Sequence, residues 1–111
     1  MTMDDIDSHI RLEDTAKGGR YVIAMPNGEL SRLSFVHAGA GHIIADSTFV
    51  PPPYREQGVA EALVRRLIED ARRQGLKITP TCWYIADEFD RHAPHWDDVR
   101  ATTPSSRPDE F

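Results

Sequence analysis

Hydrophobic residues gather in short runs in the first half of the chain and recur with a helical period in the second half. Three apolar runs predict strands at about residues 21–25, 29–37 and 42–50. Turn-forming residues separate these runs at positions 26–28 (Pro-Asn-Gly) and 38–41 (Ala-Gly-Ala-Gly). Short strands joined by tight turns are typical of an antiparallel meander, so we expect each strand to pair with the next.

A long amphipathic helix follows, from about Gln57 to Gln74. Its apolar residues return at steps of three and four and therefore share one face: Ala60, Leu63, Val64, Leu67, Ile68 and Ala71. Gly75 stands where a C-terminal cap belongs. Arg72 and Arg73 lie in the last turn, where cations complement the helix dipole, so a solvated helix face explains them better than a basic patch.

Two shorter elements complete the pattern. Residues 76–85 predict a fourth strand, in which Pro80 favours an edge position because proline cannot donate to a central ladder. Residues 86–92 predict a short second helix that ends before Pro94. Helices that alternate with strands in this way are expected to pack on the sheet and bury its apolar face.

The chain is expected to hold one domain, because 111 residues suffice for one modest core. We expect a flexible arm over residues 1–18, the folded domain over residues 19–99 and a disordered tail over residues 100–111. The predicted fold class is α+β, with a mixed, mostly antiparallel sheet, one long helix and one short helix.

Charge and composition argue against several classes of function. The formal net charge of -5 disfavours general nucleic-acid binding, which needs clustered lysine and arginine. The chain has one cysteine, Cys82, so an internal disulfide is excluded, and no Cys/His set has the spacing of a zinc site. We therefore expect neither a nucleic-acid partner nor a bound metal.

The pattern of apolar residues also bears on the compartment. The N-terminal residues lack the basic and apolar regions of a signal peptide. No apolar run approaches the length that is needed to cross a bilayer. We therefore expect a cytoplasmic protein with no membrane partner.

The segment from Phe49 to Ala60, FVPPPYREQGVA, carries the strongest chemical signal. The first backbone N–H groups of a helix, here from about Gln57 onward, have no acceptor within the helix and can hold a phosphate at its positive end. Gly58 has no Cβ to block a close approach, and Arg55 can add a charge-assisted bond. From these residues alone, a plain helix start with a surface arginine is a slightly better explanation.

The same residues resemble a known motif. Arg55, Gly58 and Ala60 match in register the acetyl-CoA signature of the GCN5-related N-acetyltransferases, Gln/Arg-x-x-Gly-x-Gly/Ala. The flanking segments are Thr48-Phe49-Val50-Pro51 before the motif and Pro80-x-Cys82-x-Tyr84 after the helix. Both are similar to the very small, single-domain subgroup of that superfamily that is described as the NATD1 or YjdJ type.

The resemblance implies acetyl-CoA as cosubstrate, with its pyrophosphate on the helix start and its pantetheine arm along the end of the third strand. The cofactor-binding residues that it implies are Phe49, Val50, Arg55, Gln57, Gly58, Val59 and Ala60. Core packing is the alternative role for the side chains of Phe49 and Val50. The two roles are compatible, because the contact with the ligand would run through the main chain.

Cys82 and Tyr84 are the candidate catalytic residues. The resemblance implies that Cys82 lies near the thioester, where it could accept the acetyl group if a histidine or helix N-terminus favours its thiolate. A buried structural cysteine is the commoner role. Tyr84, on the same face of the expected strand, could protonate the leaving thiolate. His42, Asp46 and Glu88 join Tyr84 as candidate proton handlers, and the sequence does not choose a base among them.

Three functions follow from this reading. The first is an N-acetyltransferase that moves acetyl from acetyl-CoA to an unidentified amine, which is a small molecule or a protein. The alternative is a non-catalytic module that senses or stores coenzyme A or acetyl-CoA in the same pocket. The third, a structural protein with no ligand, is disfavoured by the intact Arg-x-x-Gly-x-Ala register.

Overall fold

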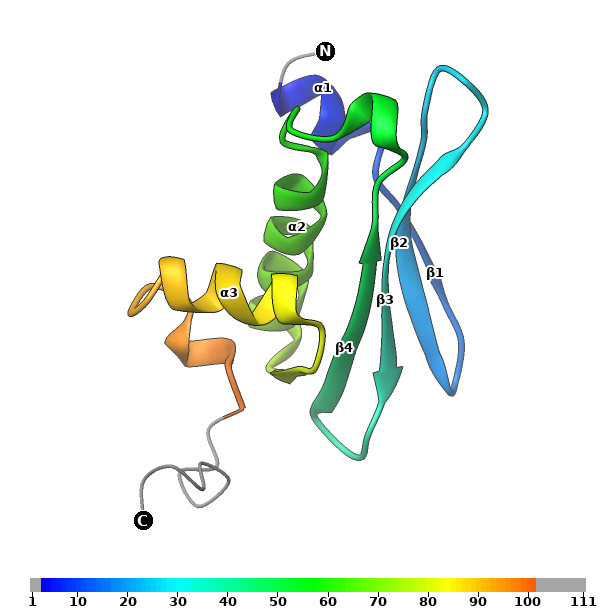
Figure 1. Cartoon of the computed structure of the whole chain (residues 1–111). Coiled ribbons are helices and arrows are strands. Elements are labelled where there is room, and N and C mark those ends of the chain that lie inside the picture. Colours follow the sequence, from blue (N-terminus) through cyan, green and yellow to red (C-terminus); the bar gives the residue numbers. More distant parts are fainter. Residues whose placement is uncertain (1–2, 102–111) are drawn as a thin grey trace.

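A computed structural model describes residues 3–101 of the chain, with side chains from Ile6 onward (Figure 1). Its elements in chain order are α1 (Met3–Ser8), β1 (Arg11–Asp14), β2 (Gly18–Ala24), β3 (Leu30–His37), β4 (His42–Phe49), the 3-10 turn η1 (Pro52–Tyr54), α2 (Val59–Gln74), β5 (Lys77–Pro80), α3 (Trp83–Arg91) and the 3-10 turn η2 (Asp97–Val99). Helices α2 and α3 lie on the same side of the sheet (Figure 1).

The sheet has five strands in the order β1-β2-β3-β4-β5. Neighbours pair antiparallel from β1 to β4, and β5 adds to the edge parallel to β4 after the crossover through α2. This arrangement confirms the predicted α+β class with a mixed, mostly antiparallel sheet, and it also confirms Pro80 on an edge strand. The structure has three α-helices rather than the two that we expected.

The core lies between α2 and the sheet. Helix α2 buries a continuous apolar face against alternate residues of the central strands, as its three- and four-residue period predicts. The buried apolar residues of the helix are Val59, Ala62, Leu63, Val64, Leu67, Ile68 and Ala71, and those of the strands include Tyr21, Ile23, Leu33, Phe35, Ile43 and Ala45. Ala60, which we had placed on the same face, is only partly buried and borders a cleft instead.

Strands β4 and β5 are paired only along the first half of β4. Their pairing runs from His42↔Lys77 to Ala45↔Pro80, whereas β4 stays paired with β3 as far as Phe49. The register of β3 and β4 shifts next to Phe35, which gives β4 an extra residue and a local bend. Residues 46–49 therefore form a stretch of strand with no neighbour on the β5 side within residues 3–101.

The N-terminal region differs from our expectation. Over the part of residues 1–18 that the structure describes, the expected flexible arm is replaced by α1 and by β1, which pairs with β2. Ile6 and Ile10 are 2% and 7% exposed and join the core, so burial of two isoleucines anchors a polar segment.

The C-terminal boundary also moves. Arg100 forms a β-bridge with Ile78, and the Ala101 N–H donates to the Ile78 carbonyl at 2.7 Å, so the ordered chain extends two residues past the expected end at 99. The rest of the predicted disordered tail, residues 102–111, lies outside the described residues. Within residues 3–101, no helix combines the length and apolar character that crossing a membrane requires.

The fourth strand and the second helix were placed wrongly by the sequence pattern. Strand β5 ends at Pro80 instead of residue 85, and α3 already begins at Trp83. The N–H groups of Thr81 and Cys82 both donate to the Ala45 carbonyl, at 3.0 and 3.3 Å, so the chain turns away from β4 there. Cys82 and Tyr84 consequently do not share one face of a strand: Cys82 is the N-cap of α3, and Tyr84 lies in its first turn.

Candidate active site

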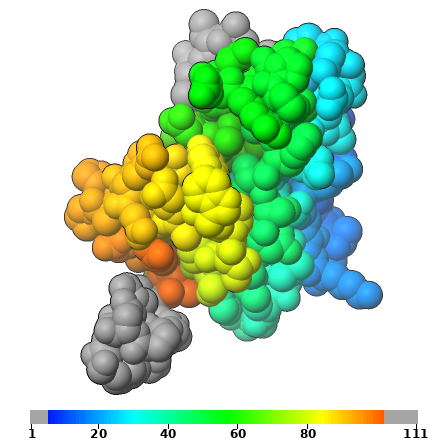
Figure 2. All heavy atoms as spheres, in the orientation of Figure 1, coloured from blue at the N-terminus to red at the C-terminus, as the bar shows by residue number. Residues whose placement is uncertain are grey.

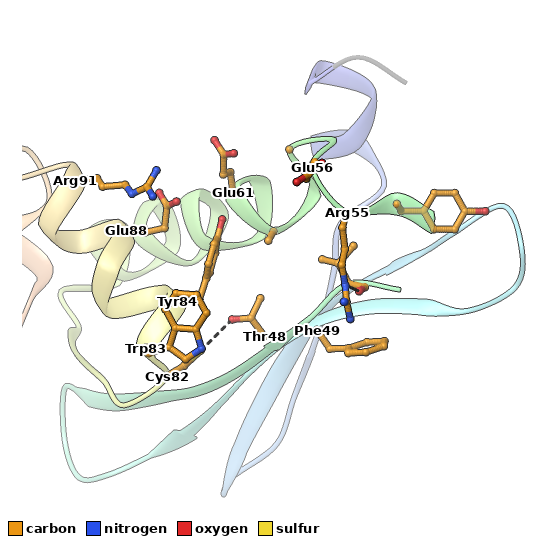
Figure 3. Close-up of a pocket in the computed structure, with 14 residues that line it drawn as sticks. Thr48, Phe49, Arg55, Glu56, Glu61, Cys82, Trp83, Tyr84, Glu88 and Arg91 are labelled. Carbon is orange, nitrogen blue, oxygen red and sulfur yellow. Dashed lines mark hydrogen bonds between the residues drawn. The ribbon is translucent and has the colours of Figure 1, made fainter. Parts of the chain in front are cut away.

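A cleft of about 720 Å³ opens where the unpaired end of β4 meets the starts of α2 and α3. The segment from Val50 to Gly58 closes one end of it, and the first two turns of α3 form the opposite wall. Figure 2 shows the face on which the yellow surface of α3 meets the green surface that leads into α2. Figure 3 shows the lining side chains, which come from these separate elements.

The start of α2 presents backbone donors to this cleft. Its N-cap, Gly58, has a φ of 84° in the left-handed region, which favours glycine, and no side chain caps the helix. The first helical bond runs from the Ala62 N–H to the Gly58 carbonyl at 3.0 Å. The N–H groups of Val59, Ala60 and Glu61 therefore have no acceptor within the helix, and the positive end of the dipole lies beside them. This is the geometry that holds a phosphate.

The side chain of Arg55 contacts the segment that leads into α2 rather than the first turn of α2. Its Nε donates to the Val50 carbonyl at 2.8 Å, and its guanidinium carbon lies 5.8 Å from the centre of the Phe49 ring. The guanidinium of Arg32 lies over the same ring at 4.7 Å. Arg55 therefore ties the loop after the prolines to the end of β4.

The structure brings five of the seven expected cofactor-binding residues to the cleft. These are Phe49, Val50, Arg55, Gly58 and Ala60. The other two do not line it. The side chain of Gln57 turns back to donate to the Pro53 carbonyl at 3.3 Å, and the side chain of Val59 is buried in the core. Any contact of these two residues with a phosphate would therefore have to run through the main chain.

Cys82 lines the cleft at the N-terminus of α3. Its Sγ lies 3.7 Å from the Thr48 hydroxyl oxygen, which comes from the unpaired end of β4 (Figure 3). No hydrogen bond to a histidine or another base is found for this thiol among the described residues. Trp83, the next residue, is 78% exposed at the rim of the cleft.

Tyr84 and Glu88 lie one helical turn apart on α3 and both line the cleft. Figure 3 shows Tyr84 rising from α3 toward Glu61 of α2. Burial raises the pKa of the Tyr84 hydroxyl well above its ordinary value, and the negative charges of Glu88 and Glu61 raise it further. Tyr84 is consequently a protonated phenol at neutral pH, able to donate a proton or a hydrogen bond.

Glu88 is buried although it is a carboxylate, with 4% of its surface exposed. Its Oε2 lies 3.3 Å from Nε2 of His92. The His92 ring stacks on Trp96 with centroids 3.9 Å apart. Sequence reasoning named Glu88 as a candidate proton handler but missed its contact with His92, because that contact depends on α3 starting at Trp83 and running through both residues.

Two of the four candidate proton handlers stay away from the cleft. His42 lies 2.6 Å, through Nε2, from the Thr79 hydroxyl on β5. Asp46 is exposed at the irregular point of β4 and does not line the cleft. Of the four candidates, Tyr84 and Glu88 are therefore the two that line the cleft.

The cleft combines hydrogen-bond donors for an anion at one end with an acid and a carboxylate at the other. Between them runs the free edge of β4, whose backbone can pair with an extended ligand. The chain belongs to the GCN5-related N-acetyl-transferase family, whose model matches residues 20–99.

A solved structure supports the fold. The chain is similar to the NMR structure of a GCN5-like N-acetyltransferase candidate from Staphylococcus aureus, with 23% sequence identity and a TM-score of 0.62. The similarity covers 86% of this chain and 92% of the other. Among curated proteins, none matches the sequence. The family and the shared fold therefore identify the chain as a GCN5-related N-acetyltransferase domain.

Proposed function

We propose that the protein binds acetyl-CoA in the cleft and transfers the acetyl group directly to an amine. The observation that carries this proposal is the convergence of three features on one cleft: free amides at the start of α2, the open edge of β4, and the acid–base pair Tyr84 and Glu88. Family membership supplies acetyl-CoA as the expected donor.

In this proposal the pyrophosphate binds the free N–H groups of Val59, Ala60 and Glu61. The pantetheine arm extends along β4 past Val50 and Phe49, which directs the thioester toward α3. The carboxylates of Glu56 and Glu61 also border the cleft, so backbone donors and the helix dipole, rather than a surplus of cationic side chains, must hold the anion.

Direct transfer needs an oriented thioester, a neutral amine and a proton for the leaving thiolate. The Tyr84 phenol is the proton donor that we assign, because it lines the cleft and is protonated at neutral pH. Cys82 stands at the N-terminus of α3, but its thiol has a hydroxyl neighbour and no histidine or other base among the described residues, so one of the two activating features of a nucleophilic cysteine is missing. We therefore assign Cys82 to the wall of the thioester site.

Thermal unfolding tests the binding part of this proposal. At a concentration about 100-fold above its Kd, acetyl-CoA should stabilise the fold by about 2.7 kcal/mol. Gly58→Glu should abolish the shift, because it forces a side chain into a left-handed conformation and adds negative charge at the phosphate position. Gly75→Glu is the matched control: Gly75 has a φ of 70° at the far end of α2, so strain is similar and the shift should persist.

Turnover across a panel of amines tests the transfer part. Acetylation faster than hydrolysis supports a transferase, whereas an acetyl-CoA shift without turnover supports the alternative of a non-catalytic coenzyme A-binding module. The absence of any shift at millimolar acetyl-CoA contradicts both. Three points remain predictions: the NATD1 or YjdJ subtype, the identity of the acceptor and a cytoplasmic location.

A further inference from the structure

Two carboxylates are buried among the described residues, Asp70 and Glu88, and their surroundings differ. Asp70 accepts a hydrogen bond from Tyr21 and forms ion pairs with Arg66 and Arg73. These permanent cations offset the cost of burying its charge, so Asp70 has a structural explanation.

Glu88 has no such explanation. No arginine or lysine forms an ion pair with it among the described residues, and Arg91, the nearest cation on its helix, pairs with Asp87 at 2.8 Å. The neighbours of Glu88 are instead two groups that can themselves gain or lose a proton, Tyr84 and His92. A buried carboxylate in a cleft with titratable partners is typical of a proton-transfer site.

The position of His92 provides a path for a proton from Glu88 to solvent. Its ring is held flat against Trp96, with an interplanar angle of 11°, and its Nε2 faces the Glu88 carboxylate. The side chain of His92 is 45% exposed, whereas that of Glu88 is 6% exposed. The two side chains therefore link the inside of the cleft to solvent.

We propose that Glu88 is the base that deprotonates the acceptor amine, and that His92 is a positioning residue that holds this carboxylate and returns its proton to solvent. The proposal rests on the transferase function above. The charged groups around Tyr84 and Glu88 are Glu61 from α2 and Arg91 and His92 from α3. Binding of a protonated amine would give Glu88 the direct ion pair that no arginine or lysine of the described residues supplies.

The proton balance is closed by residues of this chain. Glu88 takes one proton from the ammonium group, and the freed lone pair forms the C–N bond to the acetyl carbon. As the C–S bond breaks, the thiolate takes the proton of Tyr84, and the second proton lost from nitrogen restores the Tyr84 phenol. The proton on Glu88 leaves through His92, so one proton is released for each acetyl group transferred.

Two surrogate acceptors of equal size test this assignment. Ethylamine is protonated near neutral pH and needs a base, whereas methoxyamine is already neutral there. Glu88→Gln should lower kcat/KM for ethylamine by about 100-fold or more, the usual contribution of a general base, and should leave methoxyamine unchanged. His92→Gln should weaken the ethylamine reaction less and should also spare methoxyamine. Asp90→Asn, which removes an exposed carboxylate two residues later on α3, is the control and should affect neither, because Asp90 pairs with Arg100 and does not line the cleft.

Each outcome of this experiment either supports or overturns the assignment of Glu88 as the base. Equal losses with the two amines would mean that Glu88 acts only on structure, and the proposal would be wrong. Full ethylamine activity in Glu88→Gln would leave the transferase function standing and overturn the role of Glu88. If the unmodified protein binds acetyl-CoA but acetylates neither amine, the base assignment fails for simple amine acceptors, while the binding part of the proposed function still stands. Should Glu88→Gln not fold, the selective loss in His92→Gln decides in its place.

Discussion

The buried carboxylate Asp70 offers a quantitative test of how the fold is held together. Tyr21 on β2 donates from its hydroxyl to Oδ2 of Asp70 on α2 at 2.8 Å, and both residues are buried. Arg66 and Arg73 also contact the carboxylate, but 33% and 64% of their side chains are exposed. Asp70→Ala removes the acceptor of a buried phenol and frees two arginines that water can solvate.

The expected cost has two parts. Leaving the Tyr21 hydroxyl buried without an acceptor costs about 1–3 kcal/mol. Each half-exposed ion pair contributes about 0–1 kcal/mol, because water screens it. Together these parts predict a loss of about 1–5 kcal/mol in the free energy of unfolding, and for a domain of roughly 100 residues each kcal/mol lowers the melting temperature by about 4–8 °C.

Urea unfolding monitored by circular dichroism measures this loss. Tyr21→Phe is the comparison, because it removes the hydroxyl and leaves Asp70 with both arginines, so its cost should be only about 1 kcal/mol. A cost for Asp70→Ala no larger than that of Tyr21→Phe would refute the reasoning. It would mean that neither the buried phenol nor the arginines depend on the carboxylate.

Three further predictions concern the cleft and the same tyrosine. Cys82→Ala should leave amine acetylation unchanged, and intact-mass analysis with acetyl-CoA should find no acetyl adduct on Cys82; an adduct together with lost turnover would establish a covalent route. Tyr84→Phe should lower kcat by about 100-fold or more through loss of the proton donor, while the thermal shift with acetyl-CoA persists; an unchanged kcat would exclude that role. Burial and the contact with Asp70 raise the pKa of Tyr21, so its contribution is complete below the ordinary tyrosine pKa of about 10 and is lost as pH rises beyond it. Stability should therefore fall steeply in alkali, and Tyr21→Phe should fall less; parallel curves would contradict this.

The sequence predicts α2 well because one physical effect dominates there. Leu63 and Leu67 repeat at helical spacing over many turns, and Gly75 in the left-handed region ends the helix as a cap. The same register places the cleft residues Gly58 and Ala60 at the start of the helix, before its first turn is complete.

The sequence pattern misplaced the start of α3 because the residues there have a high strand propensity. Trp83, Tyr84 and Ile85 all favour strands by intrinsic propensity, so they read as a continuation of β5. In the fold, Ile85 is the one buried residue of these three. The next buried apolar residue on α3 is Phe89, four residues later. A nine-residue helix offers too few repeats for that spacing to stand out.

Tertiary contacts decided what the local pattern could not. Helix α1 depends on Ile6 and Ile10 meeting the core, which no periodicity in six residues reveals. The burial of Glu88 depends on the cleft between α2 and α3, and its pairing with His92 depends on the true start of α3. Arg55 matches the signature, yet its side chain binds the Val50 carbonyl, a contact that only the folded loop creates.

The central claim is that acetyl-CoA lies between the start of α2 and the free edge of β4. Amide chemical-shift mapping of the isotope-labelled protein during titration with acetyl-CoA tests it most directly. We expect the largest shifts at the amides of Val59, Ala60 and Glu61, together with Phe49 and Val50, and small shifts on β1 and β2. Saturating acetyl-CoA that leaves the start of α2 unshifted, or that shifts another face of the protein instead, would contradict the account.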